Sequence, residues 1–391
     1  MASIRTCIVA GSHPPILCGI GDYTAPLARA LSGKGVDAFV LVSPEGVPQP
    51  NGGDELPYEL IAVPGWSLRH VLIIWQFIAS INPDVVHVVY PGRAYGYGLA
   101  PILTPYIARA VGLPSVLTLH EFKMARLLRK LADIALMLPM HAILVPSASE
   151  RDAIARCNRN LASKVMVSTA GPTIRPQWLS EDERIALRHQ LGIGADAFAI
   201  AYFGFIHPHK GTKHAIEVFA RVSERLSNVW LIVIGAFEPA LDRYHAVIHQ
   251  LAIDLSINER IRWMGAQPPQ RVSHLLQICD VALLPFPDGA STRRGTLIVS
   301  IQHGLPVITT AGERAIFERF GEAVLTVDSI NDIDGMAHYI VKLFGDREWL
   351  FALKQYARTR MPDWNTAWDE IANHTLEMYN DVLKRDARKA R

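Results

Sequence analysis

Residues 198–212 read FAIAYFGFIHPHKGT, and this stretch decides the fold class. Its first six residues are apolar without alternation, which is typical of a parallel strand that helices cover on both faces. A loop containing Gly204, Pro208 and Gly211 follows, and apolar residues then recur at helical spacing over 212–226. The stretch therefore predicts a strand, a loop and a helix, the unit from which doubly wound α/β sheets are built.

The same succession of strand, loop and helix repeats on both sides of this stretch. In the second half, strands are expected at 198–203, 229–234, 260–264, 281–284 and 306–309, with helices at 212–226, 244–251 and 271–278. In the first half, strands are expected at 4–10, 37–42, 85–89, 115–119 and 142–145, with a helix at 23–31. Strands that alternate with helices favour parallel sheets. We predict two Rossmann-like, doubly wound domains of the α/β class that face a cleft.

The length of 391 residues is enough for two domains of ordinary size. We expect one domain over residues 1–175, a second over 190–362, and a last helix with a basic tail over 364–391. The linker between the domains contains Ser180 and Glu183, whose spacing predicts a capping box at a helix start.

Composition excludes several classes of protein. Half of the residues are apolar, which excludes a disordered chain, and 39 Lys+Arg against 37 Asp+Glu give no reason to expect nucleic-acid binding. The four cysteines lack the spacing of a zinc site or a disulfide framework. No segment resembles a targeting peptide or a membrane span. We expect a soluble, cytoplasmic protein that needs neither cofactor nor metal.

The loop after the first strand contains Gly19 and Gly21, which would let the backbone approach an anion at the start of the next helix. A Gly-x-Gly pair alone is weak evidence for an anion site, because many turns of this kind hold no ligand. The loop is also too long for the dinucleotide fingerprint and lacks its third glycine. A nicotinamide-binding domain is therefore disfavoured.

Two loops of the second half carry cations at predicted carboxyl ends of strands. Lys210 lies at a strand-to-helix corner, where an ammonium group can meet a diphosphate, although a solvated lysine is the commoner case. The segment 285–297 combines small residues, hydroxyls and two guanidinium groups, and its candidate anion-binding residues are Ser291, Thr292, Arg293, Arg294, Gly295 and Thr296. The alternative is a capped surface helix whose arginines face water. We favour the anion site.

The order of five motifs resembles the GT-B glycosyltransferases of the large retaining family 4, also called glycosyl transferases group 1. The motifs are the glycine-rich first loop, LTLHE at 117–121, VPS at 145–147, FG with KG at 203–211, and GLPV at 304–307. Each motif alone has low specificity, but five motifs in the family's order and spacing, over nearly the whole chain, are specific for the fold.

The resemblance implies an enzyme that moves a sugar from a nucleotide diphosphate sugar to a hydroxyl acceptor, with retention of configuration and without a metal. The donor would bind mainly to 190–362, where Lys210 would contact its diphosphate, and Gly19 and Gly21 would close over it from the acceptor domain, 1–175. His120 matches the histidine that approaches the donor sugar. The acceptor would be a glycan or a lipid-linked sugar, and the last helix would return to the first domain.

Two departures from the family pattern open alternatives. Phe205 stands where the family has an arginine, and Ser291 and Val299 stand where it has the two glutamates of a Glu-x7-Glu motif. Arg293 and Arg294 are our candidates to replace the missing cation. The lost carboxylates keep two rival functions open: a non-catalytic partner or regulator, and a GT-B epimerase or phosphorylase.

A basic segment follows His120. It contains Lys123, Arg126, Arg129 and Lys130 beside an apolar series that begins with Leu127, Leu128 and Leu131. Two interpretations remain: a helix that rests on anionic lipid at the inner face of the membrane, and a solvated basic face over a stripe of core leucines.

Overall fold

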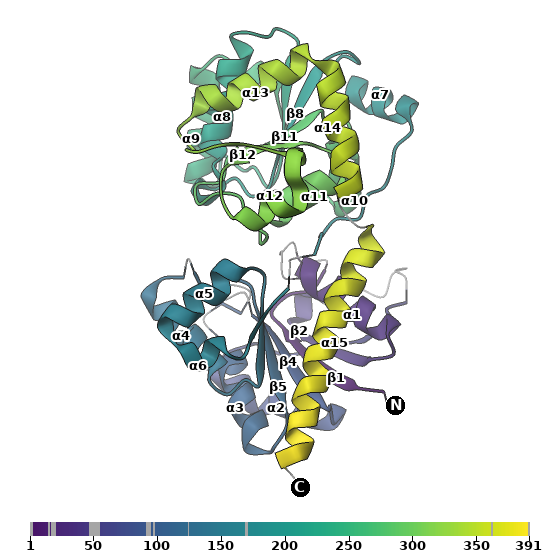
Figure 1. Cartoon of the computed structure of the whole chain (residues 1–391), viewed down its shortest axis with the longest axis vertical. Helices are drawn as coiled ribbons and strands as arrows, with labels where there is room; N and C mark the ends of the chain where they lie inside the picture. Colours follow the sequence, from purple (N-terminus) through teal and green to yellow (C-terminus); the bar gives the residue numbers. More distant parts are fainter. Residues whose placement is uncertain are drawn as a thin grey trace. The chain divides into compact units, whose positions relative to one another are not determined.

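The computed structural model describes residues 3–14, 16, 21–46, 55–90, 95–96, 98–123, 125–168, 171–360 and 363–389. The chain folds into two compact units, one of residues 1–173 with 365–391 and one of residues 174–364 (Figure 1).

The first unit contains a parallel sheet of seven strands in the order β3-β2-β1-β4-β5-β6-β7. The strands are β1 (Arg5–Ala10), β2 (Asp37–Val42), β3 (Glu59–Ala62), β4 (Val85–Tyr90), β5 (Ser115–Leu119), β6 (Ala142–Val145) and β7 (Val165–Val167). The central strands β1, β4 and β5 are almost wholly buried, since β-branched and other apolar side chains fill both of their faces. The chain reverses its direction of winding between β1 and β4, which is where such sheets bind ligands.

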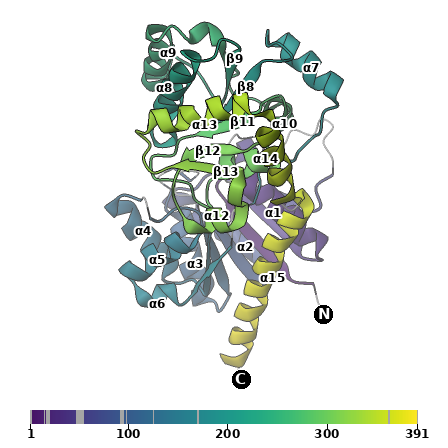
Figure 2. The same cartoon turned by 45° about the horizontal axis from the view of Figure 1, so that its top comes forward.

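The helices of the first unit are α1 (Gly21–Gly33), α2 (Val71–Ile81), α3 (Ala100–Ala110), α4 (Leu127–Met137), α5 (Ala148–Cys157), α6 (Arg159–Ala162) and α15 (Trp364–Lys389). Figures 1 and 2 show α4, α5 and α6 grouped on one side of this unit, and α15 (yellow) running along it beside α1. Buried hydrogen bonds hold α15: Trp368 Nε1 donates to the Pro172 carbonyl at 2.9 Å, the Tyr379 hydroxyl lies 2.7 Å from His87 Nδ1, and the Thr6 hydroxyl donates to the Tyr379 hydroxyl at 3.4 Å.

The second unit contains a parallel sheet of six strands in the order β10-β9-β8-β11-β12-β13. The strands are β8 (Phe198–Phe203), β9 (Val229–Ile234), β10 (Ile261–Trp263), β11 (Val281–Leu284), β12 (Val307–Thr310) and β13 (Val324–Val327). The helices are α7 (Glu181–Gln190), α8 (Thr212–Ser223), α9 (Arg243–Asp254), α10 (Pro269–Gln277), α11 (Gly295–Gln302), α12 (Arg314–Phe320), α13 (Ile333–Gly345) and α14 (Arg347–Arg360). Here the winding reverses between β8 and β11.

The predicted fold class, two Rossmann-like parallel-sheet domains, is confirmed. The predicted capping box is also present, because the Ser180 and Glu183 side chains each accept a hydrogen bond from the other residue's backbone N–H. Three strands were not predicted: β3, β7 and β13. Among the helices that the structure describes, none has the length and apolar character needed to cross a bilayer.

Candidate active site

Lys210 ends a short 3-10 turn, Pro208–Lys210, between β8 and α8. The next residue, Gly211, has φ +70°, and a Cβ there would overlap the carbonyl oxygen of Pro285, the residue that follows β11. Only glycine meets both demands, the left-handed backbone and the close approach. The corner therefore brings Gly211, the residue after Lys210, against Pro285 at the beginning of the 285–296 segment, where the winding of the sheet reverses.

The 285–296 segment buries three of its six polar residues, Ser291, Thr292 and Arg294. Arg294 is buried with its guanidinium carbon 4.3 Å from the centre of the Phe286 ring, and both Arg293 and Arg294 form ion pairs with Asp288. The alternative in which both arginines face water is therefore wrong for Arg294. The two guanidinium groups thus share one carboxylate of their own segment.

Three hydroxyl groups at this edge of the sheet are buried and lack hydrogen-bond partners within the described part of the chain. They belong to Ser291, Thr296 and Thr310. Buried polar groups in native proteins are almost always paired, so hydroxyls in this position at the carboxyl ends of strands can take their partners from a ligand. Ser291 and Thr296 were predicted to bind the donor; Gly295, also predicted, is the first residue of α11.

Two residues at the same edge were not predicted. Thr310 ends β12, and Glu313 lies in the loop that follows. Glu313 Oε2 accepts hydrogen bonds from the Thr292 N–H at 3.2 Å and the Thr292 hydroxyl at 3.3 Å. The signal was present in the sequence, because both residues follow the predicted strand 306–309 and therefore lie at its carboxyl end.

His120 directly follows β5, and its N–H donates to the Tyr90 carbonyl at the end of the neighbouring β4. Its ring lies edge-on to that of Tyr23 in α1, with 4.6 Å between the ring centres. Burial lowers the pKa of the imidazole to about 4, so that the ring is neutral near pH 7. Nε2 is buried and has no hydrogen-bond partner among the residues described. The ring can thus offer one nitrogen to a ligand at this edge.

Glu150, a residue that sequence reasoning missed, holds the segment that follows His120. Its buried carboxylate Oε2 accepts hydrogen bonds from the backbone N–H groups of Phe122 at 2.9 Å and Lys123 at 2.7 Å. Bonds to an ionised acceptor are about twice as strong as neutral ones. Glu150 lies in the first turn of α5, whose N-cap is Ser147, so the VPS motif helps to fix the backbone after His120.

Gly21 is the first residue of α1 and packs against the backbone of His13, where a Cβ would come within 3.1 Å of the His13 Cα and carbonyl carbon. This close packing explains the glycine without a ligand. Gly19 lies outside the described residues, so its predicted role stays a prediction.

The basic segment after β5 has two kinds of residue. Lys123 and Arg126 are exposed, whereas Arg129 lies 3.9 Å from Glu121 and 4.0 Å from the buried Asp133, and Lys130 lies over the Phe122 ring. The leucines of α4 divide: Leu127, Leu128 and Leu131 are 74%, 82% and 56% exposed, whereas Leu136 is fully buried in the core. A stripe of core leucines is therefore wrong for the first turns of α4 and holds only near its end.

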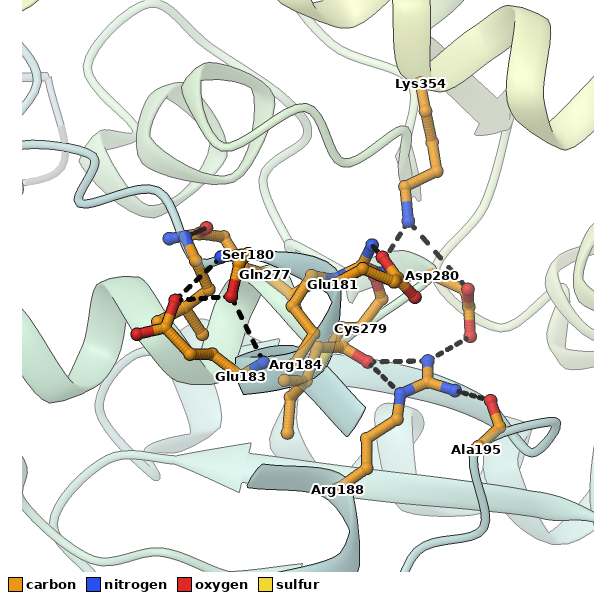
Figure 3. Close-up of polar contacts among 12 residues, drawn as sticks. Ser180, Glu181, Glu183, Arg184, Arg188, Ala195, Gln277, Cys279, Asp280 and Lys354 are labelled. Atoms are coloured by element: carbon orange, nitrogen blue, oxygen red, sulfur yellow. Dashed lines mark hydrogen bonds and ion pairs between the residues drawn. The ribbon is translucent and has the colours of Figure 1, made fainter. Parts of the chain in front are cut away.

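A second polar cluster lies at the opposite edge of the second unit's sheet, where β11 begins (Figure 3). Arg188 donates to the carbonyls of Ala195, Ala197 and Ile278 and to the Asp280 carboxylate. Lys354 from α14 completes the cluster, 3.8 Å from Asp280. Because the guanidinium group is saturated by backbone and carboxylate oxygens, we interpret this cluster as structural.

Two family models match the chain. The model of the glycosyl transferases group 1 family matches residues 183–360, and the model of the glycosyl transferase 4-like domain matches residues 18–169. The chain belongs to the group 1 glycosyl transferases. The family resemblance of the five motifs is thereby confirmed.

Relatives of this group 1 glycosyl transferase support the same assignment. A D-inositol 3-phosphate glycosyltransferase of Nocardia farcinica is 29% identical over 207 residues, 51% of this chain and 44% of that protein. The match therefore spans less than half of the curated relative's length.

Two solved structures are similar over the whole length of both chains. The sucrose-phosphate synthase of Thermosynechococcus elongatus has a TM-score of 0.72 and 16% identity, covering 97% of this chain and 100% of that one. Anabaena Alr3699/HepE in complex with UDP and glucose has a TM-score of 0.73 and 16% identity, covering 96% and 100%. At this identity the likeness shows the fold, which is GT-B.

Proposed function

We propose that this group 1 glycosyl transferase moves a sugar from a nucleotide diphosphate sugar to a hydroxyl group of an acceptor, as a step in glycan assembly. The observation that carries the proposal is the close approach of Gly211, next to Lys210, to Pro285 where the second sheet reverses its winding. Cations coincide there with buried hydroxyls that have no partner among the described residues, and a sugar diphosphate has the complementary chemistry.

Lys210, Arg293 and Arg294 bind and stabilise the departing diphosphate. Preorganised donors of this kind act where charge develops in the transition state, and they do so without a metal ion. The Anabaena protein holds UDP and glucose in its solved structure, which supports a nucleotide-sugar donor for this chain.

His120 acts as a neutral hydrogen-bonding group beside the donor sugar. A protonated imidazole would repel the positive charge that develops at the anomeric carbon, whereas a neutral ring can orient a sugar hydroxyl. Burial of the ring supports this role, as does its Nε2, which has no partner in the part of the chain that the structure describes. The sugar keeps its anomeric configuration, as the family resemblance implies.

The acceptor is a glycan or a lipid-linked sugar at a membrane surface, and α4 contacts that surface. Its exposed leucines and the exposed Lys123 and Arg126 combine an apolar face with positive charge, the pattern of helices that lie in the interface of anionic membranes.

A donor screen tests the proposed function. The full chain is incubated with UDP-, GDP-, ADP- and dTDP-sugars in the presence of EDTA, and binding is followed by the shift in melting temperature. A donor that binds is then tested for release of its nucleoside diphosphate, and the anomeric proton of the product is observed by NMR. We expect binding, slow hydrolysis and a retained configuration. Stabilisation without turnover, with or without hydroxyl acceptors, would instead favour the non-catalytic alternative.

A further inference from the structure

The loops that follow β11 and β12 are joined by backbone hydrogen bonds at the edge of the sheet where Lys210 lies. The Ala290 N–H donates to the Thr310 carbonyl at 3.0 Å, and the Glu313 N–H donates to the Ala290 carbonyl at 2.7 Å. Gly312 makes this approach possible, because a Cβ there would overlap the Ala290 carbonyl. The segment 310–313 is therefore part of the same rigid surface as the 285–296 loop.

Two carboxylates lie on this surface, and they have different surroundings. Asp288 forms ion pairs with both Arg293 and Arg294, so its negative charge is compensated within the loop. Glu313 is half-buried and accepts two hydrogen bonds from Thr292 through Oε2, which fixes the direction of its side chain. Positions 291 and 299 of the neighbouring segment carry Ser and Val, which offer no charge.

We infer that Glu313 and Thr310 bind the sugar of the donor and set which sugar this enzyme accepts. The inference rests on the proposed function and adds to it two residues outside the motifs that suggested it. A carboxylate accepts strong, charge-assisted hydrogen bonds from sugar hydroxyls, and the buried Thr310 hydroxyl, unpaired within the described part of the chain, can both donate and accept.

The inference predicts that sugar binding and nucleotide binding depend on different residues. Glu313 and Thr310 act on the sugar, whereas Lys210 acts on the diphosphate. A variant at Glu313 must therefore weaken the binding of a nucleotide sugar and leave the binding of the free nucleoside diphosphate nearly unchanged.

The test compares Kd values for UDP and UDP-glucose, and for the GDP, ADP and dTDP pairs, by isothermal titration calorimetry. Glu313→Gln keeps an oxygen for Thr292, so the loop retains its anchor; Thr310→Val keeps the shape and removes the hydroxyl. Glu318→Gln is the control, since Glu318 lies on α12 and forms an exposed ion pair with Arg314. We expect Glu313→Gln to weaken nucleotide-sugar binding about tenfold or more, and Thr310→Val about threefold, with the nucleoside diphosphate within about twofold of wild type.

An equal loss for the sugar conjugate and the free diphosphate would overturn the inference, because Glu313 would then only hold the loop. Unchanged affinities in both variants would overturn it as well. Lys210→Ala separates the two proposals, since it should weaken both ligands. A wild-type chain that binds none of the four pairs would contradict the proposed function itself, and the inference with it.

Discussion

The chemistry of His120 depends on its burial. The ring is covered by Tyr23 and follows a fully buried strand, and this environment lowers its pKa to about 4. The charged form is disfavoured because an imidazolium ion loses its hydration there. In our account, the imidazole must be neutral because positive charge develops on the sugar that it contacts.

Replacing His120 by alanine should lower the turnover of the bound donor about a hundredfold, within the range usual for one positioned polar group. The pH profile of the wild type should show no loss between about pH 8 and pH 6 from this residue, because its ring is already neutral there. Steady-state rates across this range check both statements. His338→Asn, at an exposed position of α13, is the control. A wild-type rate in His120→Ala would remove the residue from the mechanism.

Asp133 should make stability depend on pH. Burial raises the pKa of its carboxyl from 3.8 to about 7, and neither carboxylate oxygen has a hydrogen-bond partner among the described residues. The folded state therefore binds a proton more tightly than the unfolded state, so this contribution to stability is present below about pH 4 and is lost as the pH rises to about 7.

Asp133→Asn should remove that loss. At pH 8 the variant should be more stable than wild type by roughly 2 kcal/mol or more, since each unit of pKa change corresponds to about 1.4 kcal/mol. The difference should shrink as the pH is lowered toward 5. Urea unfolding at both pH values measures it, and a difference independent of pH would show that Asp133 is ionised in the folded state.

At the scale of elements, the strands that sequence reasoning missed share one property. β3 and β7 are the two edges of the first sheet and β13 is an edge of the second, and all three are short and partly exposed. A strand covered on one side only need not be continuously apolar, so its pattern is weak. The buried central strands, by contrast, were predicted almost to the residue.

The site residues divide in a similar way. Lys210 and Ser291 lie in loops marked by glycine and charge next to strongly apolar strands, so the sequence alone was enough to propose them as site residues. Glu313 and Glu150 act through contacts with residues far away in the chain, at Thr292 and at Phe122 and Lys123. Such contacts depend on the order of the strands in the sheet. Local periodicity in the sequence does not predict that order.

The exposed face of α4 predicts binding to anionic vesicles. In a variant with Leu127, Leu128 and Leu131 replaced by serine, the partition coefficient for vesicles should fall about tenfold or more. The reason is that burying one leucine side chain in an apolar medium is worth about 2 kcal/mol. Co-sedimentation with phosphatidylglycerol vesicles at low and high salt measures this. Leu241→Ser, at an exposed loop position of the second unit, is the control and should bind like wild type. Equal binding by all three proteins would exclude α4 as the contact.

The Arg188 cluster joins α7, β11 and α14, and should be a major determinant of the stability of the second unit (Figure 3). Arg188→Met should lower the free energy of unfolding by about 3–5 kcal/mol, because it leaves the buried Asp280 with a weaker partner and several carbonyls without donors. Chemical unfolding measures the change. Arg225 is an exposed arginine after α8, and Arg225→Met should lower the free energy of unfolding far less. A loss below about 1 kcal/mol would contradict the structural interpretation.

At the scale of the whole molecule, the chain contains two doubly wound units, and each has polar residues at the carboxyl edge near its point of reversal. The second unit presents cations there, with hydroxyls that are unpaired within its described residues, and the first presents a neutral histidine. In our proposal these are the donor side and the acceptor side of one sugar transfer.

The most direct test of this claim is the release of nucleoside diphosphate from a panel of UDP-, GDP-, ADP- and dTDP-sugars by the full chain and by its Lys210→Ala variant. The account predicts that at least one donor is hydrolysed by the wild type and that the variant loses about tenfold or more in its affinity for that donor. Binding and release that are absent with every donor, or that are equal in the wild type and in Lys210→Ala, would contradict it.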